Sequence, residues 1–243
     1  VGAVVGVQPF GGEGLSGTGP KAGGPLYLLR LLSQRPADAL ARTFADADRA
    51  TPPEDAVRER LLAPLATLQQ WAQLQGNAAL ASTCQRFARQ TQSGTARTLH
   101  GPTGERNVYT LAPRARVLCL AQSVDDLLTQ TAAVLATGGT ALWPNAQASL
   151  RAQLHTLVQA QVMLQDNTLN DGTLELDAVL HHGDTPSLQA VCTALTRRAG
   201  PIVGVTALQP GATDIPLERL MIERALSVNT AAAGGNASLM TIG

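Results

Sequence analysis

The strongest pattern of apolar positions in the first half of the chain repeats every three or four residues, the spacing of one face of an α-helix. This stripe consists of Val57, Leu61, Leu65, Leu68 and Ala72. We expect a capping box at Thr51 and Glu54 to start the helix and Gly76 to end it. A second helix is expected from Asn77 to about Gln92, and the short connection predicts an antiparallel helical hairpin.

Beyond about residue 108, short apolar runs alternate with helical stretches. The expected strands are 116–121, 140–143, 162–165, 178–181 and 202–208. The expected helices are 123–138, which Ser123 and Asp126 cap, then 146–159, 186–198 and 217–224. Strands that alternate with helices of this length predict right-handed crossovers and a mainly parallel, Rossmann-like sheet. The fold class is therefore α/β, with a helical region ahead of the sheet.

The beginning of the chain predicts less regular structure. Residues 1–10 are apolar and β-branched with interspersed glycines, which favours a strand or an extended loop. Residues 11–25 contain seven glycines and two prolines, so we expect no regular element there. The apolar run 25–32 is compatible with a short strand or a helical turn.

Composition narrows the class of protein. Only 15% of the 243 residues are charged, too few for a disordered chain, and 44% are hydrophobic. The 18 basic and 18 acidic side chains balance, which argues against generic binding to nucleic acid or anionic lipid. No stretch approaches the ~20 apolar residues of a membrane span. Because the chain opens on Val1 and runs directly into an apolar segment, we expect a C-terminal piece of a longer polypeptide.

The cysteines and histidines have structural interpretations that compete with chemical ones. Cys84, Cys119 and Cys192 are widely spaced, which favours free buried thiols of a reducing compartment over a disulfide or a metal site. His181 and His182 could suggest a metal site, but adjacent residues of a strand point to opposite faces. We therefore expect them to be histidines at a solvent-exposed strand end.

A glycine motif and two blocks of charge are the other candidates for chemistry. Gly12–Gly17 matches the dinucleotide fingerprint Gly-x-Gly-x-x-Gly, but the glycines and prolines that follow forbid the helix that the fingerprint requires. Residues 86–116 contain six arginines and one acid, whereas residues 166–184 contain five acids and no base. Either these faces balance each other, or the basic stretch is a shallow site for an anionic partner.

Three segments carry a resemblance to a known family. Residues 8–19, Gln-Pro-Phe-Gly-Gly-Glu-Gly-Leu-Ser-Gly-Thr-Gly, resemble the Pro-Phe-Gly-Gly signature of aldehyde dehydrogenases. Residues 20–28 narrow the resemblance to the Δ1-pyrroline-5-carboxylate dehydrogenase branch, and residues 101–107 are similar to the same branch. Residues 227–240 are similar to the C-terminal motif of long proline utilization A proteins, which join proline dehydrogenase and pyrroline-5-carboxylate dehydrogenase in one chain.

The resemblance implies four parts and a substrate site. The parts are the end of an aldehyde dehydrogenase domain (1–35), a helical linker (36–95), a degenerate Rossmann-like aldehyde-dehydrogenase-like domain (96–224) and a C-terminal motif tail (225–243). By resemblance, backbone N–H groups of Gly2 and Ala3 anchor the substrate carboxylate, and Phe10 packs against the aliphatic chain of glutamate semialdehyde. The catalytic cysteine of the family lies upstream, so no catalytic, cofactor-binding or metal-binding residue is expected in this chain.

The resemblance also implies the setting of the full-length protein. Its cofactors would be NAD and FAD, its partners the rest of the polypeptide and glutamate semialdehyde or pyrroline-5-carboxylate, and its location the cytoplasm. Homo-oligomerisation, peripheral association with the inner membrane and DNA binding are further implied properties. Trp143 stands where a functional family member has a lysine, which puts ribose binding in doubt.

Two further hypotheses compete with this expectation. The chain could be a non-catalytic scaffold or interaction module, or an independent NAD-binding enzyme, which the failed glycine fingerprint disfavours. For the tail, one hypothesis is a lid over the cavity between the two active sites, and the other is an edge strand of the Rossmann-like sheet.

Overall fold

The computed structural model describes residues 3–17, 19–32, 35–36, 38–44, 50–51, 54–166, 169 and 174–230. Gly2 and the end of the tail, residues 231–243, lie outside the described residues, so the structural predictions made for them stay predictions.

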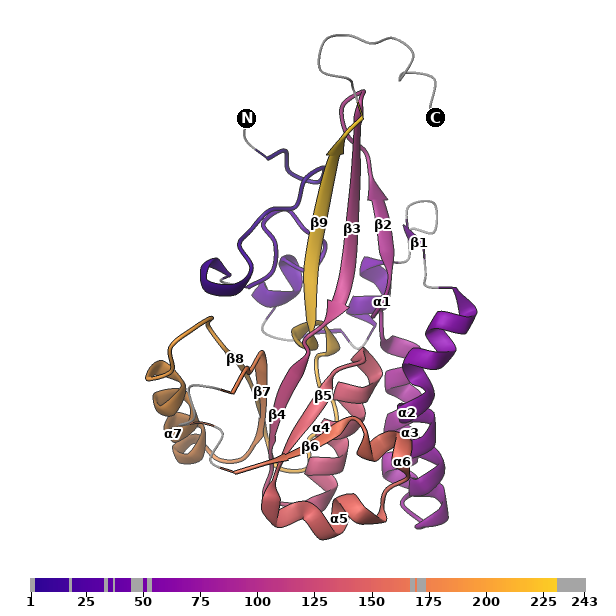
Figure 1. The fold of residues 1–243 in the computed structure, drawn as a ribbon, viewed down its shortest axis with the longest axis vertical. Helices are drawn as coiled ribbons and strands as arrows, with labels where there is room; N and C mark the ends of the chain where they lie inside the picture. The colour runs from indigo at the N-terminus through magenta and orange to yellow at the C-terminus, as the bar shows by residue number, and fades with distance from the viewer. Residues whose placement is uncertain are drawn as a thin grey trace.

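A five-stranded parallel sheet forms the lower half of the molecule in Figure 1. Its strand order is β6-β5-β4-β7-β8, and all four neighbouring pairs are parallel. The strands are β4 (Arg116–Leu120), β5 (Thr140–Pro144), β6 (Val162–Gln165), β7 (Ala178–His182) and β8 (Gly204–Leu208). All five were expected within two residues at each end, and the α/β fold class is confirmed.

Two hydrophobic cores cover the two faces of this sheet. In β4, Val117 and Cys119 belong to the larger core, whereas Leu118 between them belongs to the smaller one. The same alternation occurs in β5, where Leu142 joins the smaller core and Trp143 the larger. Strands buried on both faces read as continuous apolar runs, which is why these segments were recognisable from the sequence.

Helices on the larger core come from both halves of the chain. The helix α4 (Val124–Thr137) is buried along most of its length, and Ser123 caps it as expected. The helices α2 (Asp55–Leu74) and α3 (Ala78–Gln90) form the expected hairpin and pack on α4. On the other face, Val191 of α7 (Thr185–Thr196) contacts the smaller core.

The predicted capping box of α2 is wrong. The helix begins at Asp55 with Glu54 as its N-cap residue, whereas Thr51 belongs to β1 (Ala50–Thr51). Thr51 precedes a proline, and a residue before proline is disfavoured in helical conformation, so it takes the extended conformation of a strand. Gly76, with φ of 73°, follows the end of the helix as expected.

A second, antiparallel sheet extends away from the parallel sheet (Figure 1). Its strand order is β1-β2-β3-β9, with β2 (Ala96–Leu99), β3 (Glu105–Pro113) and β9 (Met221–Asn229). The hairpin of β2 and β3 was not anticipated from the sequence. Residues 14–16 and 28–31 of the N-terminal segment form the 3-10 helices η1 (Gly14–Ser16) and η2 (Leu28–Leu31).

The expectation of a helix over 217–224 is wrong. Only Leu217–Leu220 is helical, as the 3-10 helix η4, and β9 begins at Met221. This strand pairs with all nine residues of β3, and that long-range ladder outweighs a weak local preference for helix. The tail therefore starts as an edge strand of the antiparallel sheet, not of the Rossmann-like sheet, and the domain boundary proposed at 224/225 falls inside β9.

Three smaller features complete the comparison with the sequence. The helix expected over 146–159 is divided into η3 (Asn145–Gln147), α5 (Ala148–Gln153) and α6 (Thr156–Gln159). Leu154 and His155 are extended between α5 and α6, and His155 Nδ1 caps α6 by accepting from Leu157 N, 3.2 Å away. A short helix, α1 (Ala39–Thr43), lies beside the antiparallel sheet. Cys84 and Cys119 are buried thiols as expected, whereas Cys192 is exposed.

Candidate functional site

The glycine-rich loop is closed at its base by a two-residue bridge. Phe10 N donates to Ala22 O at 3.1 Å, and Ala22 N donates to Phe10 O at 2.8 Å. Within the loop, η1 ends at an extended Gly17, and none of the described residues 19–25 is α-helical. The loop therefore lacks the helix N-terminus that would face a pyrophosphate in the dinucleotide fingerprint. The loop needs a glycine at position 12 to avoid a clash, because a Cβ there would lie 2.2 Å from Ser16 Oγ.

A buried carboxylate fastens this loop to the antiparallel sheet. Glu223 of β9 accepts from the backbone N of Lys21 at 2.7 Å and from the hydroxyl of Tyr109, in β3, at 2.7 Å. It also accepts from Leu26 N at 3.4 Å. Two donors of the N-terminal segment and one of β3 thus converge on the oxygens of one buried side chain. Glu223 therefore holds the end of the glycine-rich loop against the antiparallel sheet.

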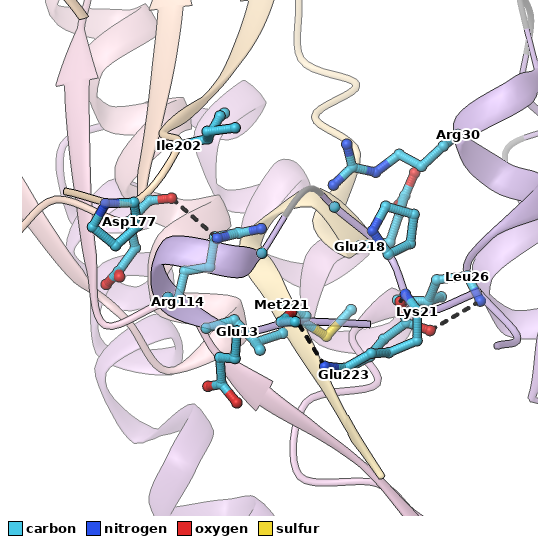
Figure 2. A pocket seen from close by; sticks show the side chains of 18 of the residues that line it. Glu13, Lys21, Leu26, Arg30, Arg114, Asp177, Ile202, Glu218, Met221 and Glu223 are labelled. Carbon is cyan, nitrogen blue, oxygen red and sulfur yellow. Dashed lines mark hydrogen bonds between the residues drawn. The ribbon is translucent and has the colours of Figure 1, made fainter. Parts of the chain in front are cut away.

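Beside this anchor lies a cavity of about 320 Å³, seen from close by in Figure 2. The cavity is lined by the glycine-rich loop, η2, β9 and the connections around the parallel sheet. The charged residues of the lining are Glu13, Lys21, Arg30, Arg114, Asp177, Glu218 and Glu223. The guanidinium groups of Arg30 and Arg114 point into the space between them (Figure 2). No local pattern in the sequence indicates this set, because its members are separated by up to 210 residues.

The predicted substrate residues lie on another cavity. Ala3 and Phe10 are both exposed, Phe10 to 64%, and they line a space of about 590 Å³ that Ala225 and Ser227 of β9 also border. Gly2, the other predicted anchor, lies outside the described residues. The structure thus brings Ala3 and Phe10 to one cavity next to the start of the tail.

The two adjacent histidines are buried, so the expectation of solvent-exposed side chains is wrong. They do point to different partners. His182 contacts the side chain of Gln130 through Nδ1 at 2.8 Å and the carbonyl of Ala212 through Nε2 at 2.8 Å. His181 Nε2 lies 3.0 Å from Ser187 Oγ. Burial lowers the pKa of His181, so this ring is neutral near pH 7.

Trp143 and the blocks of charge have structural partners. Trp143 is fully buried, and its indole Nε1 donates to Thr131 Oγ1 of α4 at 2.9 Å. Arg116 of the basic stretch pairs with Glu175 of the acidic stretch at 2.9 Å, at the surface. Within the part of the chain that the structure describes, no three His, Cys, Asp or Glu side chains gather as a metal site. No helix among these residues has the length and apolar character needed to cross a membrane.

Comparisons with known proteins cover the whole chain. It is 55% identical over 246 residues to the bifunctional protein PutA of Salmonella typhimurium and 53% identical over 245 residues to that of Escherichia coli. The bifunctional protein PutA of Rhizobium meliloti is 38% identical over 251 residues. Each match includes all of this chain but only 18%, 18% and 19% of the respective relative. No family model matches the chain.

Solved structures give weaker likenesses. A bifunctional proline utilization A protein aligns with a TM-score of 0.47 and 20% identity, over 73% of this chain and 22% of that one. Lactaldehyde dehydrogenase from Escherichia coli aligns with a TM-score of 0.49 and 10% identity, over 70% and 42%. The relationship rests on the sequence matches, and by them the chain belongs to the proline utilization A (PutA) family, as a segment that spans about a fifth of the length of its relatives.

Proposed function

We propose that this chain is the part of a proline-oxidising bifunctional enzyme that completes the substrate site of the second reaction and covers it. The full-length protein would oxidise proline to pyrroline-5-carboxylate with FAD and then glutamate semialdehyde to glutamate with NAD⁺. The observation that carries the proposal is the identity of 53–55% with bifunctional PutA proteins along the entire chain. Both cofactors would be held by residues outside this chain, since its glycine-rich loop lacks the required helix.

The substrate role is assigned to the first ten residues. Backbone N–H groups of Gly2 and Ala3 would hold the carboxylate of glutamate semialdehyde, because small residues present amides to an anion without obstruction. Phe10 would cover the aliphatic part of the substrate and keep water from the reacting carbon. The exposure of Ala3 and Phe10 on a common cavity supports this role.

Substitution of Ala3 tests the anchor in the full-length enzyme. Ala3→Pro removes one N–H, and a lost hydrogen bond to a charged group costs about 1.5–3 kcal/mol, or roughly ten- to a hundredfold in KM for glutamate semialdehyde. Ala3→Ser keeps the N–H and is the matched control. An aldehyde without a carboxylate should react almost equally well with all three proteins. Equal losses for both substrates would contradict the anchor, because they indicate a defect in folding.

The covering role is assigned to the Rossmann-like sheet and the tail. It is supported by the position of β9, which borders the same cavity as Ala3 and Phe10. Deletion of residues 229–243 from the full-length enzyme should leave proline dehydrogenation nearly unchanged. It should introduce a lag in NADH formation from proline, because the intermediate escapes to solvent. A truncated enzyme that stays folded and shows neither lag nor loss of the second reaction would exclude a lid.

A further inference from the structure

The side chain of Arg30 forms no hydrogen bond with the residues that the structure describes, although its backbone N donates to Tyr27 O at 3.2 Å. It lies in η2, and its side chain is half-buried at the wall of the 320 Å³ cavity. A guanidinium group has five N–H donors and stays charged at any physiological pH. Taking such a group partly out of water without an acceptor is unfavourable, so its placement requires an explanation.

Two further arginines surround Arg30 and increase this cost. Burial lowers the pKa of Arg30, and the nearby charges of Arg219 and Arg114 lower it further, whereas the charges of Glu218 and Glu223 act in the opposite direction. Among the described residues, the side-chain hydrogen bonds of Arg114 go to neutral acceptors: Nε donates to the carbonyl of Arg219 at 3.0 Å and Nη1 to the carbonyl of Asp177 at 3.1 Å. The positive charges of Arg30 and Arg114 are thus turned toward the same space without a directly bound carboxylate (Figure 2).

The acidic side chains at the cavity are already engaged. Glu218 pairs with Arg35 at 2.9 Å, and Glu13 pairs with Arg224 at 2.7 Å. Glu223 accepts from two backbone N–H groups and a tyrosine hydroxyl, as described above. Asp177 accepts from the backbone N of Arg116 at 2.9 Å. Each of these carboxylates therefore has at least one donor of its own. Among the described residues none of them is hydrogen-bonded to Arg30, although the charges of Glu218 and Glu223 lie close enough to attract it.

We propose that the cavity between Arg30 and Arg114 binds a small oxyanion, a carboxylate or a phosphate group. Both groups offer two coplanar oxygens, which match the planar fork of a guanidinium. The volume of about 320 Å³ is at the lower end of the range for small-molecule sites, so the ligand is of metabolite size. Arg30 would donate two hydrogen bonds to the oxyanion. Arg114, which the carbonyls of Arg219 and Asp177 hold in place, would contribute a second positive charge on the opposite side.

This site differs from the proposed substrate anchor. Its lining includes neither Ala3 nor Phe10, and Lys21 borders both cavities. The ammonium group of Lys21 is bound to the carbonyls of Gly11 and Gly12, and so it holds the loop at the wall of the new site. The proposal stands whether or not Ala3 binds substrate.

Hydrogen exchange of the full-length protein, read by mass spectrometry, tests the site locally. The probes are inorganic phosphate and the dicarboxylate glutarate, each compared with chloride at the same ionic strength. Ligand at ten times its dissociation constant should slow opening of the binding region by about tenfold. We expect this protection in peptides that span residues 10–32 and 217–224, with phosphate, with glutarate or with both. The probe that gives the larger protection indicates whether the site prefers a phosphate group or a carboxylate.

Variants connect the protection to the arginine. Arg30→Gln should abolish it, whereas Arg42→Gln, at an exposed ion pair with Asp38, should leave it unchanged. Ile202 lines the cavity and is 71% exposed, so Ile202→Asp places a competing carboxylate there without disturbing a core. This variant replaces Arg30→Gln as the test if Arg30→Gln does not fold. No protection with either probe, or protection that survives Arg30→Gln or Ile202→Asp, overturns the proposal.

Discussion

Glu223 illustrates how one side chain can determine the path of a distant loop. Its two oxygens accept from Lys21 N, Leu26 N and the hydroxyl of Tyr109, and the residue is almost inaccessible to water. Burial, followed by the charge of Glu223 and the hydrogen bond to it, raises the pKa of Tyr109. The phenol therefore keeps its proton and remains a donor near neutral pH. All three of these hydrogen-bond donors to Glu223 are neutral groups.

Glu223→Gln should release the glycine-rich loop. The amide replaces one acceptor oxygen by a donor that would face other donors, and loss of a bond to a charged group costs about 1.5–3 kcal/mol. Hydrogen exchange in residues 10–26 of the full-length protein should accelerate by roughly ten- to a hundredfold. Glu175→Gln, at the exposed pair with Arg116, is the control and should change little. Equal effects of the two substitutions would argue against the anchor.

The thiols should differ in reactivity according to burial. Burial raises the pKa of Cys84 from its usual 9.0 to about 12 and also raises that of Cys119, so neither forms a thiolate near pH 7. Cys192 is exposed. Native alkylation followed by peptide mapping should modify Cys192 first, with the other two reacting only after unfolding. Rapid native modification of Cys84 would show that the helical hairpin opens readily.

The raised pKa values also predict the sign of a pH effect. Above pH 9 the thiol of Cys84 loses its proton in the unfolded chain but keeps it in the folded one. The unfolded state then binds fewer protons, so the free energy of unfolding falls as the pH rises from about 9 to 12. Cys84→Ala should reduce this slope in denaturant titrations, although it lowers stability at neutral pH.

Among the secondary-structure elements, α4 begins with the N-cap that the sequence predicts. Ser123 Oγ accepts from Asp126 N at 3.1 Å. Ser123→Ala should lower the free energy of unfolding by about 1 kcal/mol. Ser149→Ala is the matched control, since Ser149 is an exposed residue of α5 for whose side chain the described residues offer no hydrogen bond. A shift in the denaturant midpoint for both variants would mean that the effect is not one of capping.

Elements whose stability is local were predictable, and elements that depend on distant partners were not. The strands of the parallel sheet and the helices α2, α3 and α4 carry continuous apolar runs, apolar stripes or caps. By contrast, β9 is a strand because β3, more than a hundred residues earlier, is its partner. Its inward Glu223 also breaks the apolar alternation that would mark a strand.

The candidate site shows the same division. Phe10 and Ala3 could be selected from a motif that is contiguous in the sequence. Arg30, Arg114 and Glu223 come together only through the antiparallel sheet, so no local pattern indicates them. The burial of His181 and His182 was missed for a related reason, because the helix α7 and the connection through Ala212 that cover them are not encoded in β7 itself.

For the molecule as a whole, we predict that the 243-residue chain does not bind NAD⁺ by itself. Isothermal titration of the 243-residue chain with NAD⁺ should give no saturable heat, once circular dichroism has shown that the chain is folded. The physical reason is the loop geometry, since Gly17 is extended where a helix would have to begin. Saturable micromolar binding would contradict this and favour an independent nucleotide-binding module.

The pairing of β3 with β9 has a consequence for how the chain folds. The ladder joins Pro113 to Met221 and so encloses the entire parallel sheet as an insertion between two neighbouring strands. Closing a flexible loop of that length costs on the order of 4 kcal/mol in entropy. Prior folding of residues 114–220 would bring the two ends together, so the parallel sheet should form early and β9 should join last. In pulse-labelling hydrogen exchange during refolding, amides of β4 should therefore become protected before those of β9.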